Sequence, residues 1–189
     1  MKPILFNTEM VRAILEGLKT VTRRVVKPQP KGQLVPTLSG GCWPGYFEEI
    51  GTSRVQRPPY RPGNILYVRE TWQQGLGGTY LYKASAGLDL FMNKEGNLVS
   101  NIPWCPSIHM PREAARIFLR VTDVRVERLQ EMPPYDIAFE GFRKQKDFIA
   151  LWNSTIKPSD RDLYGWDANP WVWVIEFERI SRGEALSDE

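Results

Sequence analysis

Residues 17–29 read Gly17-Leu18-Lys19-Thr20-Val21-Thr22-Arg23-Arg24-Val25-Val26-Lys27-Pro28-Gln29, and they hold cations and hydroxyl groups close together. Five of the seven residues from Lys19 to Val25 are Lys, Arg or Thr, and the next acidic residue along the chain is Glu48. Such side chains contact phosphate groups or take part in activating a hydroxyl for nucleophilic attack. The alternative is a strand whose polar face meets only water, and composition alone favours it, since runs of charge usually face solvent.

A helix is predicted directly before this stretch, and a strand within it. Asn7 or Thr8 can cap the helix, its apolar residues recur at helical spacing, and Gly17 suits a left-handed turn at its end. The strand is predicted from residue 20 to residue 26, ahead of Pro28. Alternation along it puts Lys19, Val21, Arg23 and Val25 on one face and Thr20, Thr22, Arg24 and Val26 on the other. A turn at Lys19 would bring its amine toward Thr22.

Strands outnumber helices in the rest of the predicted chain. We predict strands over 2–6, 65–72, 79–84, 116–128 and 171–180, and short helices over 135–140 and 144–154. In the last strand, Trp173 and Phe177 are expected to be buried. Predicted loops are the insertions 28–63 and 84–112 and the segment 155–169, and residues 181–189 are predicted to be a disordered acidic tail. Because strands and helices do not alternate regularly, the sequence favours a mixed α/β (α+β) fold over a doubly wound sheet.

The bulk composition is typical of a globular protein. At 189 residues the chain is long enough to bury one core, so we expect a single domain over residues 1–180. It has no run of about 20 apolar residues and no recognisable signal peptide, so we expect a cytoplasmic protein that does not enter a membrane. The net charge is +3, and residues 184–189 carry three acids and no base, so residues 1–183 carry +6. That modest excess is compatible with a nucleic-acid partner.

Cysteine and histidine are too few for a metal centre of the common kinds. Cys42 and Cys105 are far apart in the sequence and form no Cys-x-x-Cys pair. His109 is the only histidine, which excludes a site built from several histidines. We therefore expect no metal and no cofactor.

Four motifs occur in an order that resembles one family. They are Gly-x-Lys-Thr-x-Thr-x-Arg at residues 17–24, Pro-Gly-Asn-Ile-Leu-Tyr-Val-Arg-Glu-Thr-Trp at 62–72, Ser-Ile-His-Met-Pro-Arg at 107–112 and Trp-Asp-Ala-Asn-Pro-Trp-Val-Trp at 166–173. The set is similar to the longer phage- and prophage-type members of the ASCH domain family, a branch of the PUA-like superfamily associated with RNA. The similarity runs from about residue 2 to residue 180, and it implies a PUA-like β-barrel of about six strands with short peripheral helices.

One subgroup of small ASCH proteins hydrolyses the amide of acetylcytidine, and the resemblance implies where its catalytic residues lie here. By position they are Lys19, Thr22 and, on the later helix, Glu140. A Thr hydroxyl attacks once a base such as a desolvated Lys removes its proton, and a carboxylate can hold the Lys or protonate the departing amine. Arg23 or backbone donors would stabilise the oxyanion.

This catalytic assignment has a structural alternative, namely an ion pair between Lys19 and Glu140 that only supports the fold. A close carboxylate raises the pKa of a Lys, so Lys19 can act as a base only where burial outweighs that effect.

A further group of polar and aromatic residues is predicted to bind the substrate. Glu70 lies in phase with the apolar face of strand 65–72, so it either pairs with a cation or lines a pocket as the site carboxylate in place of Glu140. Tyr67 and Trp72 are candidates for a pocket wall. His109 is a candidate acid or base, although a structural role is favoured because no second His can partner it. The predicted binding residues are Thr20, Arg23, Arg24, Tyr67, Arg69, Glu70, Trp72, His109 and Arg112.

Three functions stay open, and in each the expected partner is RNA or a modified nucleoside and the protein a monomer. The first is an amidohydrolase for acetylated cytidine, which requires Lys19, Thr22 and a carboxylate to converge in a concave site. The second is a non-catalytic RNA-binding module with an exposed Lys19 on a flat basic surface. The third is a ribonuclease that uses Lys19, Glu70 or His109.

Overall fold

The structure is a computed structural model, and it describes the chain except for residues 37–46, 53, 87–90, 93–96, 100–101 and 188–189. The chain divides into two compact units. Unit 1 comprises residues 1–17, 65–119 and 179–189, and unit 2 comprises residues 18–64 and 120–178. The single domain over 1–180 stays a prediction, and each unit is described by itself.

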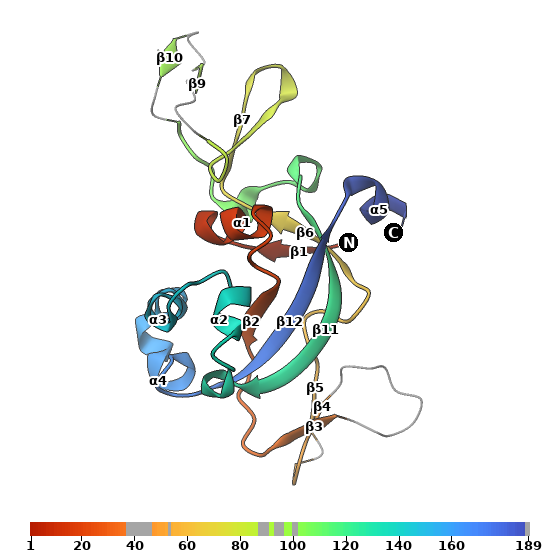
Figure 1. Ribbon diagram of the computed structural model, residues 1–189, viewed down its shortest axis with the longest axis vertical. Helices are drawn as coiled ribbons and strands as arrows, with labels where there is room; N and C mark the ends of the chain where they lie inside the picture. The colour runs from red at the N-terminus through yellow and green to blue at the C-terminus, as the bar shows by residue number, and fades with distance from the viewer. Residues whose placement is uncertain (37–46, 53, 87–90, 93–96, 100–101, 188–189) are drawn as a thin grey trace. The chain divides into compact units, whose positions relative to one another are not determined.

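The largest sheet has five strands (Figure 1). Its hydrogen-bonded order is β1-β6-β11-β12-β2, and its strands are β1 (Lys2–Leu5), β6 (Ile65–Arg69), β11 (Phe118–Arg128), β12 (Trp171–Ile180) and β2 (Val21–Val25). β1 runs parallel to β6, whereas β12 and β2 are antiparallel. The mixed α/β class is thus confirmed. The order ends at β1 and at β2, and within the described residues no pairing closes it into the predicted barrel.

Unit 1 contains helix α1 (Thr8–Leu15), which begins and ends as predicted. The Asn7 Oδ1 accepts a 2.8 Å hydrogen bond from the backbone N–H of Met10, and Gly17 has a φ of 75° just past the helix end. The other elements are β7 (Trp72–Gln74), η1 (Leu76–Gly78), β8 (Tyr80–Tyr82), β9 (Phe91–Met92), β10 (Leu98–Val99), η2 (Ser107–His109), η3 (Arg112–Ala114) and α5 (Arg182–Ser187). The predicted insertion 84–112 therefore holds the β9–β10 pair and two one-turn helices, and part of it lies outside the described residues.

The C-terminal segment differs from its prediction, because residues 182–187 form helix α5 where a disordered tail was expected. The backbone N–H of Ser181 donates to the Glu184 carboxylate at 2.8 Å, and the N–H of Glu184 donates to the Ser181 hydroxyl at 3.2 Å. This reciprocal pair is a capping box, which satisfies backbone donors that the first turn leaves open. Ala185 is fully buried, so the helix is also packed against the unit.

The segment 28–63 of unit 2 is another correction, because part of this predicted loop forms a three-stranded sheet. Its strands are β3 (Leu34–Pro36), β4 (Phe47–Glu49) and β5 (Arg54–Gln56). Glu49 accepts hydrogen bonds from the backbone N–H groups of Lys31 and Gly32 at 2.6 and 2.8 Å, which ties the chain before β3 to the end of β4. The sequence signal was obscured by prolines and glycines that flank these very short strands.

Short helices cover one face of β2 and β12 in unit 2. They are η4 (Leu129–Glu131), α2 (Asp136–Phe139), α3 (Gln145–Thr155), η5 (Pro158–Asp160) and α4 (Arg161–Tyr164), the last two within the segment predicted as loop. Their buried apolar side chains form one core with the strands: Val21, Leu129, Met132, Ile137, Phe148, Trp152, Val172 and Val174. On the opposite face of β12, Trp173 and Phe177 are buried as predicted, and the Trp173 ring lies 5.4 Å from that of Phe47. None of the helices in the described residues is long and apolar enough to cross a membrane.

Leu129 tests this core. It is fully buried, so Leu129→Ala should lower the free energy of unfolding by about 2–5 kcal/mol through the lost contacts and the cavity left behind. The matched control is Leu163→Ala, the same chemical change at a side chain that is 60% exposed, and it should shift stability by less than about 0.5 kcal/mol. Denaturant unfolding of both variants measures the difference, and equal effects would contradict the assigned core.

Candidate active site

The residues around Lys19 join the start of β2 to the end of α2 within unit 2. The backbone N–H of Thr20 donates to the carbonyl of Phe139 at 2.9 Å, and Lys19 and Glu140 form an isolated antiparallel bridge. The carbonyl of Thr20 in turn accepts a 2.9 Å hydrogen bond from the N–H of Phe177 on β12. These backbone contacts hold the Lys19 and Glu140 side chains at one place.

Lys19 is buried, and its amine is surrounded by acceptors. The residue is 3% exposed. Its Nζ donates to Glu140 Oε2 at 2.5 Å, to the Glu140 carbonyl at 3.1 Å and to the Val21 carbonyl at 2.8 Å. The Val21 carbonyl belongs to the peptide unit that leads into Thr22. The structure therefore brings Lys19 and Glu140 into direct contact and puts the amine one peptide unit from Thr22.

Arg23 is wholly enclosed by carboxylates. Its guanidinium donates to Glu127 Oε1 from Nε at 2.9 Å and from Nη2 at 2.7 Å, to Asp136 Oδ2 at 2.5 Å and to Glu140 Oε1 at 3.2 Å. The side chain has no exposed area. Arg23 consequently cannot contact a substrate directly, and its effect on the site is to hold the second oxygen of Glu140 while Lys19 holds the first.

The local sequence of α2 explains how two acids reach one arginine. Asp136 and Glu140 are four residues apart, which puts both carboxylates on one side of the helix. Both are buried, at 4% and 3% exposure, and Gly141 ends the helix with a φ of 89°. Arg125 extends the cluster toward solvent, because its guanidinium lies 3.5 Å from both Asp136 and Glu127 and also pairs with Glu176.

Burial and charge act against each other on the two buried cations. Burial lowers the pKa of Lys19 and outweighs the raising effect of Glu140, while the positive charges of Arg24 and Arg23 lower that pKa further. Burial alone would also lower the pKa of Arg23, but Glu140, Asp136 and Glu127 together raise it. Lys19 is thus the cation of this cluster that loses its proton most readily, while Arg23 stays charged.

Thr22 and Arg24 lie on the other face of β2. Thr22 is 2% exposed and stands opposite Ile175 in the pairing with β12, and Arg24 stands opposite Trp173. Burial lowers the pKa of Arg24, and burial also raises the pKa of Tyr60, whose ring hydroxyl is close enough to Arg24 for the two to interact electrostatically. The segment 28–63 therefore contributes Tyr60 to the surroundings of this face.

The other predicted binding residues belong to unit 1. Glu70 is 1% exposed, and its two carboxylate oxygens accept from Arg116 Nε at 2.9 Å and Nη2 at 3.0 Å, so of the two alternatives it adopts the ion pair. Arg69 donates to the backbone carbonyls of Met110 and Ile108, and its half-buried side chain braces that segment.

The remaining predicted residues of unit 1 show two environments. Tyr67 and Trp72 are half-buried against an apolar cluster, and the Trp72 ring lies 5.7 Å from that of Tyr80. His109 and Arg112 are exposed. Because the Lys19 cluster lies in unit 2, the predicted catalytic and pocket residues are distributed between the two units.

The sequence analysis missed Glu127, Asp136 and Tyr60. The four-residue spacing of Asp136 and Glu140 was available as a signal, since two acids on one face of a short helix need a shared cation. Glu127 gave no such signal, because its contact with Arg23 joins residues 104 positions apart.

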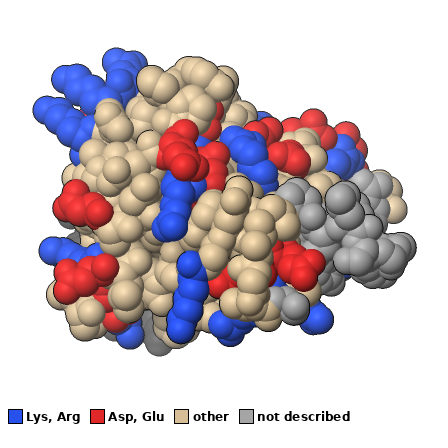
Figure 2. Space-filling model, turned by 90° about the horizontal axis from the view of Figure 1, so that it is seen from below, with Lys and Arg blue, Asp and Glu red and all other residues tan. Residues whose placement is uncertain are grey.

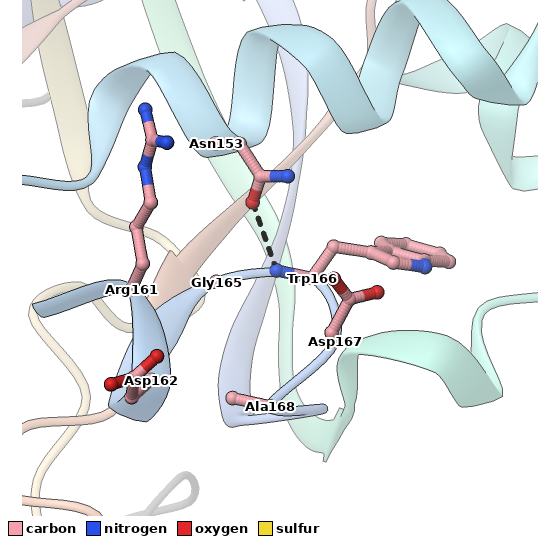
Figure 3. A pocket seen from close by; sticks show the side chains of 7 residues that line it. All are labelled: Asn153, Arg161, Asp162, Gly165, Trp166, Asp167 and Ala168. Carbon is pink, nitrogen blue, oxygen red and sulfur yellow. Dashed lines mark hydrogen bonds between the residues drawn. The ribbon is translucent and has the colours of Figure 1, made fainter. Parts of the chain in front are cut away.

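Neither of two pockets lined by described residues contains Lys19, Thr22 or Glu140. The pocket of unit 2 has a volume of about 420 Å³ (Figure 3), and its lining residues are Asn153, Arg161, Asp162, Gly165, Trp166, Asp167 and Ala168. The Asn153 side chain accepts from the N–H of Trp166 at 3.0 Å there, which fixes the loop rather than a ligand. The pocket of unit 1 is smaller, at about 220 Å³.

Two further observations concern surface charge on one face and metal ligands in the described part of the chain. On the face shown in Figure 2, basic and acidic side chains are interspersed, and no continuous basic field covers the coloured residues. No group of three or more His, Cys, Asp or Glu among the described residues could hold a metal ion.

No protein-family model, curated protein or solved structure matches this chain. What the site does is therefore inferred from its own residues.

Arg23→Met removes the central cation of the cluster with little change in volume. It leaves two buried carboxylates and the half-buried Glu127 without their shared partner, so the free energy of unfolding should fall by about 3–5 kcal/mol. The control is Arg120→Met, which removes an ion pair with Glu178 at the surface and should cost about 0–1 kcal/mol. Urea unfolding of both variants checks this, and a mild effect of Arg23→Met would contradict the enclosed cluster.

Proposed function

We propose that the chain is an ASCH-type amidohydrolase that removes the acetyl group from an acetylated cytidine, with Lys19 as base, Thr22 as nucleophile and Glu140 as the carboxylate that orients Lys19. The observation that carries the proposal is the burial of Lys19 beside Glu140. A lysine beside a carboxylate becomes neutral more readily only where burial lowers its pKa by more than the carboxylate raises it. For Lys19 the effect of burial is the larger one. We propose, as part of the same assignment, that the chain has the PUA-like barrel fold of the ASCH family.

The proposed chemistry requires the Thr22 hydroxyl to reach the Lys19 amine, which donates to the carbonyl of the neighbouring residue Val21. Neutral Lys19 takes the proton of the Thr22 hydroxyl as its oxygen attacks the acetyl carbonyl, and the resulting ammonium returns the proton to the departing cytidine amine. Water then attacks the acetyl-Thr22 ester with Lys19 again as base, which releases acetate and restores the hydroxyl. Arg24 shares the Thr22 face of β2 and would supply the positive charge for the oxyanion that the enclosed Arg23 cannot.

Two observations weigh against particular forms of the other two functions. A binding module in which Lys19 holds phosphate needs an exposed amine, and Lys19 is 3% exposed. A ribonuclease that uses Glu70 needs a free carboxylate, and Glu70 is paired with Arg116.

Thr22→Val is the decisive variant, because it removes only the hydroxyl and leaves the contact between Lys19 and Glu140 intact. We expect kcat/KM for acetylcytidine to fall by about 100-fold or more in Thr22→Val and in Lys19→Met, whereas Thr22→Ser keeps measurable activity. Lys157→Ala, at an exposed lysine of the same unit, should leave turnover unchanged. Product formation is followed by mass spectrometry, with circular dichroism as the check on folding, and absence of turnover by the wild type rejects the proposal.

The pH dependence of turnover distinguishes a catalytic Lys19 from a structural one. Because the base must be neutral, kcat/KM should rise with pH and level off above an apparent pKa that lies below the ordinary lysine value of 10.5. In Glu140→Gln the carboxylate that raises this pKa is gone, so the plateau should begin at lower pH even if the maximum falls. A profile that is the same in both proteins would contradict Lys19 as the base.

A further inference from the structure

Helix α2 has an inverted arrangement of polar and apolar residues. Its acids Asp136 and Glu140 are buried, whereas Phe139 and the preceding Tyr135 are 46% and 67% exposed. The two exposed rings lie 6.4 Å apart with an interplanar angle of 75°. Large aromatic side chains gain free energy on leaving water, so a pair kept at the surface marks a contact surface for another molecule.

The exposed charges within residues 135–146, the segment that carries this pair, are of one sign. Both acids of residues 135–146 are turned inward and engaged by buried cations, so the exposed charged residues of this segment are Arg143, Lys144 and Lys146. The next acid is Asp147, which follows directly in α3. The segment 135–146 therefore exposes two rings and three cations, and these charges complement a polyanion.

The backbone ties this surface to the candidate active site. Phe139 is the residue whose carbonyl accepts from the N–H of Thr20, and Glu140 beside it forms the bridge to Lys19. The N–H of Phe142 donates to the carbonyl of Ile137 at 3.0 Å, so the chain folds back on α2 just before Arg143. Tyr135 and Phe139 therefore precede Glu140 in the chain, and the three cations at 143, 144 and 146 follow it.

We propose that Tyr135, Phe139, Arg143, Lys144 and Lys146 bind single-stranded RNA, with bases stacked on the two rings and phosphates on the three cations. The proposal rests on the proposed function in one respect, since it makes the acetylated cytidine a residue of an RNA strand rather than a free nucleoside. Aromatic platforms beside cations suit single strands, whose unpaired bases expose their faces, and a duplex cannot offer those faces. A protein partner would use the rings without needing three cations.

Binding of a fluorescent 12-nucleotide RNA, measured by anisotropy over a series of salt concentrations, tests the surface directly. The double variant Tyr135→Ala/Phe139→Ala should weaken binding at least about fivefold, the smallest loss typical of one stacked base. The triple variant Arg143→Ala/Lys144→Ala/Lys146→Ala should flatten the plot of log affinity against log salt by up to about 2, at about 0.7 per phosphate contact. Since all five side chains are exposed, both variants should fold.

Matched controls use exposed side chains of the same unit. Ile50→Ala/Leu163→Ala removes two apolar side chains that are 56% and 60% exposed, and Lys31→Ala/Arg54→Ala/Lys157→Ala removes the same charge. Both should bind RNA nearly as the wild type does. The aromatic variant should also lose little affinity for a duplex of the same sequence.

The inference is overturned if folded wild type does not bind the single strand, or if the aromatic variant binds it as well as its control does; the second outcome would leave the rings to a protein partner. This assay needs no turnover, so it separates the two proposals. Hydrolysis of free acetylcytidine without RNA binding rejects the surface alone. RNA binding that depends on the rings, without hydrolysis of either free acetylcytidine or an RNA that contains it, rejects the proposed function alone.

Discussion

The pairing of buried charges around Arg23 is the constraint on which the rest of unit 2 depends. An ionised group removed from water costs several kcal/mol unless other charges and hydrogen bonds replace its hydration. Arg23 and Lys19 are buried together with Asp136 and Glu140, and the four groups satisfy one another only if the start of β2 and the whole of α2 hold their positions. Strand β11 must also hold its position, because its residue Glu127 accepts a hydrogen bond from Arg23. One guanidinium thus joins β2 to β11 and α2, which lie more than 100 residues further along the chain.

The same constraint separates the roles of the two cations. An arginine stays charged under nearly all conditions, so Arg23 among three carboxylates works as a permanent positive centre. A lysine can lose its proton in a protein, and burial lowers the pKa of Lys19 although Glu140 acts to raise it. The cluster thus contains a fixed charge and a titratable one that share a single carboxylate. A purely structural ion pair has no need of a titratable member, and hydrolysis of an amide does.

Local patterns in the sequence predicted the elements that depend on neighbours along the chain. The cap at Asn7, the left-handed Gly17 and the bounds of the strand 171–180 follow from such patterns and agree with the structure. The capping box at Ser181 was also present in the sequence, but the acidic tail drew the interpretation toward disorder. What the sequence could not supply was the choice of partners across the chain. Arg23 was expected to bind the substrate or stabilise an oxyanion, and its enclosure by Glu127 and Asp136 results from tertiary contacts that no local pattern encodes.

The polarity of α2 connects the buried cluster to the molecular surface. A four-residue helix is too short to be stable by itself, so its contacts determine its orientation. Asp136 and Glu140 face the buried cations and Ile137 packs in the core, whereas Tyr135 and Phe139, about one helical turn apart, lie on the exposed side. The cluster thus sets the orientation of the segment, but it does not require aromatic residues at positions 135 and 139. Their presence beside a basic run is therefore better explained by a ligand that covers them than by the packing of unit 2.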